Sequence, residues 1–214
     1  MSQQQTQRII LEIISLLIFI FILTQILVSG GVLLNLDLLT GFFVPTIENN
    51  FLTQLSIITG FIFDTITLLI ISAIISIFLW IKNNKKESLL FIASMLLTSG
   101  IVFVIKNLVQ RARPLNPLIY ESGFSFPSGH ATTSLVFFGI LTYLILIKNK
   151  SKLLKFIILC ISIFMVALIS FSRLYLNVHW MTDIVGGISL GFFILLASIT
   201  IYEIIESKVY TMFC

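Results

Sequence analysis

The chain has 214 residues, of which 58% are hydrophobic and only 10% are charged, and its mean hydropathy is +1.12. These values exclude an ordinary soluble globular domain and are typical of an integral membrane protein. The net charge of +4 is spread over short connecting segments rather than one face, so nucleic-acid binding is not expected.

Six apolar runs are long enough to cross a hydrocarbon core of about 30 Å as helices. The runs lack the alternation of a barrel strand, which favours helices. The predicted spans are 9–29, 56–81, 88–109, 130–147, 153–172 and 180–202. The sequence therefore predicts an all-α membrane protein, a six-transmembrane-helix bundle that forms one domain over 1–214. The first run is too long for a signal peptide and is expected to be retained, and the apolar connection over 30–55 is expected to lie along the membrane interface.

The basic residues are distributed unequally between the two ends of this bundle. One end holds nine cations, namely Arg8, Lys82, Lys85, Lys86, Lys148, Lys150, Lys152, Lys155 and Lys208, and the other end holds Lys106, Arg111, Arg113 and Arg173. The positive-inside rule then predicts that both termini are cytoplasmic and that the four remaining cations face outward. Cations retained on the side of a membrane protein that has few of them are usually functional.

The third predicted span ends in KNLVQRARP. Lys106 and Arg113 are seven residues apart, close to two helical turns, so they are expected to share a face. Pro114 ends the helix, which leaves the Arg113 side chain free to reach sideways. Arg111 has no comparable position, and an ordinary interfacial contact is expected for it.

The fourth predicted span opens with FPSGH. Ser128 is a natural N-cap, and Gly129 permits close approach to the backbone. Unpaired amides and the helix dipole make such a helix start suitable for a phosphate group. His130 is then placed to protonate a leaving oxygen.

The segment SRLYLNVHWMTD joins the last two predicted spans. Arg173 closes the fifth span, and His179 and Asp183 stand four residues apart at the start of the sixth. An aspartate at this spacing can hold one nitrogen of the histidine as the donor, which frees the other nitrogen to attack or to transfer a proton.

The predicted topology brings these three segments to the same membrane surface. Three cations, a helix start and two histidines are suited to hydrolysis of a phosphate ester or anhydride through a covalent intermediate. Among the other residues, Asp64 is expected to have a hydrogen-bonded packing role inside the second span. Phe124, Phe126 and Trp180 are expected to be interfacial anchors.

The three motifs resemble the signatures of the type-2 phosphatidate phosphatase family, within the histidine-dependent acid phosphatase superfamily. KNLVQRARP, PSGH and SRLYLNVHWMTD occur in that order between 106 and 183. The resemblance implies that His179 is the nucleophile, Asp183 its orienting partner and His130 the general acid. It further implies a phosphoryl site made by Lys106, Arg113, Ser128, Gly129 and Arg173, with no metal and no cofactor.

The function expected from these observations is a membrane lipid phosphatase whose site faces the outer side, in a prokaryotic plasma membrane. Its partners would be membrane lipids and a lipid phosphate substrate. Polyprenyl diphosphates, such as undecaprenyl diphosphate, are favoured, followed by phosphatidylglycerol phosphate or phosphatidate. The alternative is a non-catalytic transporter or binding protein for lipid phosphates.

Overall fold

The computed structural model describes residues 3–28 and 33–213, apart from the side chains of 4, 34, 45 and 207–213, so the Lys208 side chain lies outside the description. Every element in the described ranges is helical, as the sequence predicts. The elements are α1 (Gln3–Leu27), α2 (Leu34–Phe43), the 3-10 turn η1 (Val44–Ile47), α3 (Asn50–Ile62), α4 (Thr65–Ile81), α5 (Lys85–Val109), α6 (Gly129–Lys148), α7 (Lys152–Tyr175) and α8 (Met181–Phe213).

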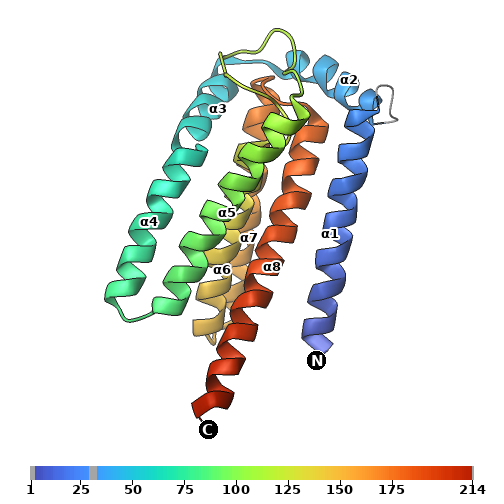
Figure 1. Ribbon diagram of the computed structural model, residues 1–214. Helices are drawn as coiled ribbons and strands as arrows, with labels where there is room; N and C mark the ends of the chain where they lie inside the picture. The colour runs from blue at the N-terminus through green and yellow to red at the C-terminus, as the bar shows by residue number, and fades with distance from the viewer. Residues whose placement is uncertain (1–2, 29–32, 214) are drawn as a thin grey trace.

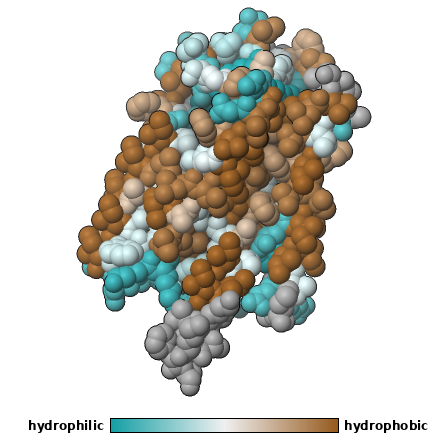
Figure 2. Space-filling view, in the orientation of Figure 1, coloured by the Kyte–Doolittle hydropathy of each residue, from teal (hydrophilic) through white to brown (hydrophobic). Residues whose placement is uncertain are grey.

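The helices have the length and composition of a membrane bundle. Within the described residues, α1, α5, α6, α7 and α8 are long and apolar enough to cross a membrane, and α3 with α4 passes the same test as a bent pair. There are thus five candidate crossings, or six when the bent pair counts as one. Figure 2 shows a hydrophobic band around the middle of the molecule, with hydrophilic residues gathered towards the two ends.

The single helix predicted over 56–81 is wrong in one respect, because the structure divides this segment into α3 and α4 with a bend of 48°. The helical geometry stops at Phe63 (φ −106°, ψ 28°). Asp64 is extended (φ −62°, ψ 153°), and its carboxylate accepts the backbone amide of Ile66 at 3.0 Å as the N-cap of α4. A capping aspartate thus replaces helix continuation in the middle of an apolar run.

Helix α6 lies at the centre of the bundle, packed against α5, α7 and α8, while α1 packs on α8 and α3 on α7. Figure 1 shows both termini and the α4–α5 turn at one end. Helix α2 and the long loop between α5 and α6 cover the other end, where α2 also contacts α8. The three sequence motifs lie at this covered end.

Small residues let α6 and α8 approach closely beside the first turn of α6. A Cβ atom on Gly187 would lie 2.9 Å from both the Ser128 carbonyl oxygen and the Thr132 hydroxyl, and one on Gly191 would lie 3.0 Å from the Thr132 carbonyl oxygen. Small residues are the usual means of close helix packing in membranes. The start of α6 is therefore fixed against α8 by backbone contact.

Gly187→Ala is expected to reduce the free energy of unfolding by about 1–3 kcal/mol, because the new methyl group must push the two helices apart. Thermal unfolding of the purified protein in detergent should show a melting temperature lower by several degrees. The matched control is Gly100→Ala, on the exposed side of α5, where a Cβ meets nothing within 4 Å. Equal melting temperatures for the two variants would contradict the packing argument.

Candidate active site

His179 and Asp183 form a buried pair at the start of α8. Their side chains are 1% and 0% exposed, and His179 Nδ1 lies 3.3 Å from Asp183 Oδ2. The same carboxylate oxygen accepts the backbone amide of Trp180 at 2.9 Å. Asp183 thus serves both as a cap for the first turn of α8 and as the partner of the imidazole.

The surroundings of the His179 ring define its tautomer. With Asp183 accepting from Nδ1–H, the lone pair is on Nε2, which lies 3.3 Å from Nη1 of Arg113. Burial lowers the pKa of His179 to about 3, although the hydrogen bond to Asp183 acts in the opposite direction. The ring is therefore neutral near pH 7, with a nitrogen available for nucleophilic attack.

The first turn of α6 is joined to the same aspartate through the main chain. The Ser128 amide donates to the Asp183 carbonyl at 3.1 Å, and the Ser128 hydroxyl caps the amide of Ala131 at 3.5 Å. Gly129 follows at the first helical position and is buried. A helix start carries amides without intrahelical partners and a positive dipole end, so this turn offers donors to an anion.

His130 is held by the break between α3 and α4. Its Nε2 lies 3.1 Å from the Gly60 carbonyl oxygen and 3.5 Å from Asp64 Oδ1. A continuous helix would pair the Gly60 carbonyl with the amide of Asp64, so the interruption provides this acceptor. Asp64, expected as a packing residue inside a straight span, therefore belongs to the surroundings of His130.

Two of the cations predicted at the site donate hydrogen bonds to carbonyl groups of the loops around it. Lys106 Nζ donates to the Phe124 carbonyl at 2.5 Å. Arg113 donates from Nη1 to the Val178 carbonyl at 2.7 Å and from Nε to the Gly123 carbonyl at 3.1 Å. Lys106 and Arg113 both lie near enough to the imidazoles of His130 and His179 to interact with them electrostatically.

The third cation, Arg173, is almost completely buried, with a side chain 2% exposed. Its Nη2 contacts the carboxylate of Glu121, which also lies 3.7 Å from Nη2 of Arg113. The guanidinium passes so close to Gly60 that a Cβ there would lie 2.5 Å from Nη1. Its Nε is buried and has no hydrogen-bond partner among the described atoms. The Nε–H of Arg173 and the two guanidinium groups that Glu121 bridges, those of Arg113 and Arg173, are suited to bind a tetrahedral oxyanion.

Arg111 is more than the interfacial contact expected from its sequence position. Its guanidinium bonds to Asp183 Oδ1 at 2.5 Å and to Asp37 Oδ2 at 2.6 Å, and it lies over the Trp180 ring. Neither Asp37 nor the bridge was predicted from the sequence. The available signal was an aspartate alone in the apolar segment LNLDLLTGFF, because a carboxylate in such a setting is costly unless it is paired.

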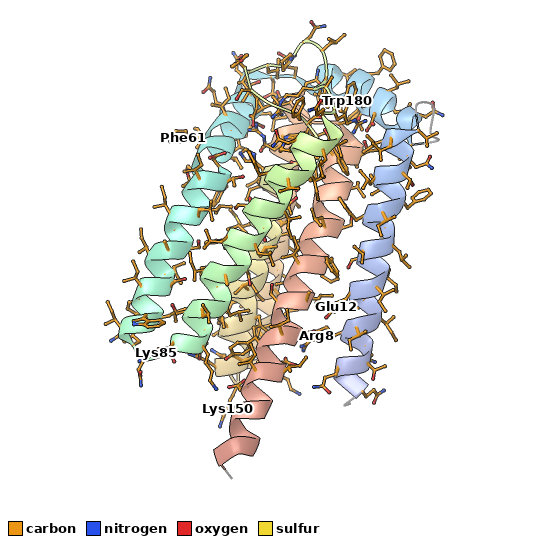
Figure 3. All side chains as sticks on the ribbon, in the orientation of Figure 1. Arg8, Glu12, Phe61, Lys85, Lys150 and Trp180 are labelled. Atoms are coloured by element: carbon orange, nitrogen blue, oxygen red, sulfur yellow. The ribbon has the colours of Figure 1, made fainter. Side chains whose placement is uncertain are left out.

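Phe126 does not lie at the membrane interface as predicted, because it is fully buried and its ring stacks on Phe19 at a centroid distance of 5.8 Å. Gly186 makes room for it, since a Cβ there would lie 2.5 Å from the ring. Trp180 lies at the covered end of the bundle (Figure 3) and donates from Nε1 to the Ala112 carbonyl at 2.9 Å. Both aromatic side chains therefore fix loops around the site.

The structure gathers all of the predicted site residues at the covered end of the bundle. They come from the end of α5, the following loop, the start of α6, the end of α7 and the start of α8, and they are Lys106, Arg113, Ser128, Gly129, His130, Arg173, His179 and Asp183. Fold and site together define a helical membrane protein with a cationic, two-histidine centre at one end.

Comparison with known proteins agrees with this class. The family model of the PAP2 superfamily matches residues 87–205, more than half of the chain, and the chain belongs to that superfamily. A crystal structure of a transmembrane PAP2 type phosphatidylglycerolphosphate phosphatase from Bacillus subtilis superposes with a TM-score of 0.81 at 25% identity, covering 90% of this chain and 96% of that one.

Curated relatives match over shorter stretches. Phosphatidylglycerophosphatase B of Bacillus subtilis is 38% identical over 93 residues, which cover 41% of this chain and 44% of that protein. Lipid A 4'-phosphatase of Bacteroides thetaiotaomicron is 37% identical over 101 residues, covering 42% and 41%. A decaprenylphosphoryl-5-phosphoribose phosphatase of Mycobacterium tuberculosis is 30% identical over 116 residues, covering 52% and 59%. The matched part of this chain thus spans 41–59% of the length of these relatives.

Proposed function

We propose that this protein is a membrane lipid phosphatase that releases phosphate from a lipid through a phosphohistidine intermediate. The observation that carries the proposal is the buried His179 ring, held by Asp183 with Nε2 beside the Arg113 guanidinium. A nucleophile next to a cation is the arrangement that phosphoryl transfer requires.

The proposed reaction has two steps. His179 Nε2 attacks the phosphorus atom, the bond from phosphorus to the lipid oxygen breaks, and His130 donates a proton to that oxygen. Water then attacks the phosphohistidine while His130 takes a proton from it, which releases inorganic phosphate and restores both rings.

The proposed phosphoryl site provides the charge neutralisation. Lys106, Arg113 and Arg173 stabilise the equatorial oxygens, and at the start of α6 the Ser128 hydroxyl and the Gly129 amide add donors. The free Nε of Arg173 supports this assignment. Because Glu121 contacts both arginines, its carboxylate must give way when the substrate phosphate enters.

The substrate is proposed to be a lipid phosphate of the bacterial membrane. A polyprenyl diphosphate such as undecaprenyl diphosphate is the first candidate. The curated relative and the solved structure from Bacillus subtilis are both named for phosphatidylglycerol phosphate, which supports that lipid at least as strongly. Phosphatidate is the third candidate. All three share the terminal phosphoryl group that the site is suited to bind.

The protein is proposed to have both termini in the cytoplasm and its site at the outer surface. The cation-rich turns that contain Lys85 and Lys150 lie at the end opposite Trp180 (Figure 3), which supports this orientation through the positive-inside rule.

The purified protein in detergent is expected to release phosphate from at least one of these lipids in the presence of a metal chelator, because protein cations supply the charge neutralisation. Vanadate, a phosphate mimic, is expected to inhibit. The measurement is colorimetric phosphate release across the three lipids, with and without chelator.

A non-catalytic lipid transporter is the alternative, and the interrupted α3–α4 pair is a feature that transporters also use. Lipid movement across proteoliposomes without phosphate release, unchanged in a His179→Ala variant, would favour the transporter. Activity that disappears with chelator and returns with a divalent metal would contradict the proposed mechanism.

A further inference from the structure

A buried carboxylate outside the three motifs is linked to the catalytic aspartate through the guanidinium of Arg111. Asp37 belongs to α2, and its side chain is 1% exposed. It lies about 70 residues before the first motif residue of the site, and outside the 87–205 segment that matches the family model. The matched segment therefore assigns it no role.

Asp37 accepts from three donors that all adjoin Asp183. Its Oδ1 accepts the Thr182 amide at 2.9 Å, and its Oδ2 accepts the Thr182 hydroxyl at 2.8 Å. Oδ2 also bonds to Arg111 Nη2 at 2.6 Å, while Nη1 of the same guanidinium bonds to Asp183 Oδ1 at 2.5 Å. The contacts form one chain from Asp37 through Arg111 and Asp183 to His179.

The charges of the hydrogen-bonded groups from Asp37 to His179 indicate more than a structural contact that holds α2 in place. Arg111 carries one positive charge between two buried carboxylates, so the three groups together keep one negative charge. If Arg111 were paired with Asp183 alone, that pair would be neutral towards His179. The second carboxylate thus preserves a negative field at the ring, which acquires positive charge as Nε2 attacks phosphorus.

The geometry has the same consequence. A guanidinium bound at both ends has a fixed plane, and this fixes Asp183 Oδ1 and leaves Oδ2 directed at His179 Nδ1. Without Asp37 the guanidinium would keep only its Nη1 contacts, to Asp183 and the Thr182 hydroxyl, and the Nη2 end would no longer be fixed. Both the orientation of the nucleophile and the charge behind it therefore depend on α2.

We infer that Asp37 is a positioning residue for the reaction, acting through Arg111 on the Asp183–His179 pair. The inference rests on the proposed function for its kinetic consequence, whereas the hydrogen bond that it predicts at His179 exists independently of activity. It assigns helix α2 a role in the chemistry.

The kinetic test is Asp37→Asn, which keeps the shape and the acceptor for Thr182 but removes the charge. We expect kcat to fall by about 10–100-fold, as for loss of one charged hydrogen bond, with KM changed less than about twofold. The matched control is Glu48→Gln, an equivalent loss of charge at an exposed position after η1, which should leave both constants unchanged. In an Arg111→Gln background, Asp37→Asn should add less than about twofold, because the route to Asp183 is already broken.

The independent test uses the fact that the chain has only two histidines. In a 15N-histidine spectrum recorded in a His130→Asn background, the parent should show a hydrogen-bonded Nδ1–H of His179. Asp37→Asn should shift or broaden this resonance, and Glu48→Gln should not.

Three results separate the possibilities. An unchanged resonance overturns the inference, even if kcat falls, because Asp37 then has only a structural role. Unchanged kcat in an active parent overturns it as well. A shifted resonance supports the coupling. If the protein with His130 intact releases no phosphate from any lipid, that result contradicts the proposed function instead.

Discussion

His179→Ala is expected to reduce phosphate release by about 10⁴-fold or more, because it removes the atom proposed to bond to phosphorus. The His179 ring is buried, oriented by Asp183 and neutral, and a water molecule in its place would have neither the fixed position nor the nucleophilicity of the imidazole. The measurement is steady-state phosphate release on the best lipid of the panel, together with a rapid quench in alkaline detergent after mixing with phosphorus-radiolabelled substrate. The parent should accumulate an acid-labile phosphoenzyme, and the variant should accumulate none.

His179→Gln is the companion variant, because glutamine retains much of the volume and can still donate to Asp183 but cannot form a stable phosphoryl adduct. Both variants should melt within a few degrees of the parent, so that loss of activity is not loss of fold. Phosphoenzyme in the His179→Gln protein would show that another residue is the nucleophile.

His130→Asn is expected to lower kcat on a lipid phosphomonoester by about 10²–10⁴-fold, the range typical of a lost general acid. The effect should depend on the leaving group. A lipid alkoxide is a poor leaving group and needs the proton, whereas nitrophenolate departs without one. On nitrophenyl phosphate we therefore expect a much smaller loss in the first step.

The measurement is the burst of nitrophenolate compared with the burst of lipid alcohol, each in parent and variant. The burst isolates formation of the phosphohistidine from its hydrolysis, in which His130 is expected to act as a base. Equal losses on both substrates in the burst phase would contradict the assignment of His130 as the acid. A polyprenyl diphosphate should behave more like nitrophenyl phosphate, since its leaving group is a phosphate.

The helical class and the placement of the motifs at helix ends were accessible from the sequence, because they depend on local patterns. Long apolar runs predict helices, and Ser128 is a strong N-cap signal that the structure places at the start of α6. The meeting of the α5, α6, α7 and α8 ends follows from alternating topology alone, whatever the direction of insertion. These inferences needed no tertiary information.

The contacts that complete the site depend on partners far apart in the chain. Nothing near Arg111 indicates that it bridges Asp183 and an acid on α2. The break at Phe63 contains neither proline nor a glycine pair, and only the capping ability of Asp64 gave a local signal. The burial of Phe126 depends on the missing side chain of Gly186, which belongs to another helix. Such complementarity between remote positions cannot be derived from one sequence without a structure.

The interruption between α3 and α4 limits how the protein can be stabilised. Replacing Asp64 with a strong helix former would favour one continuous helix over α3 and α4. The Gly60 carbonyl would then accept a hydrogen bond within that helix and would no longer accept one from His130. Given the role proposed for His130, we expect such a change to lower turnover even where it stabilises the fold. Thermostable variants with changes at this junction are therefore expected to release phosphate more slowly than the parent.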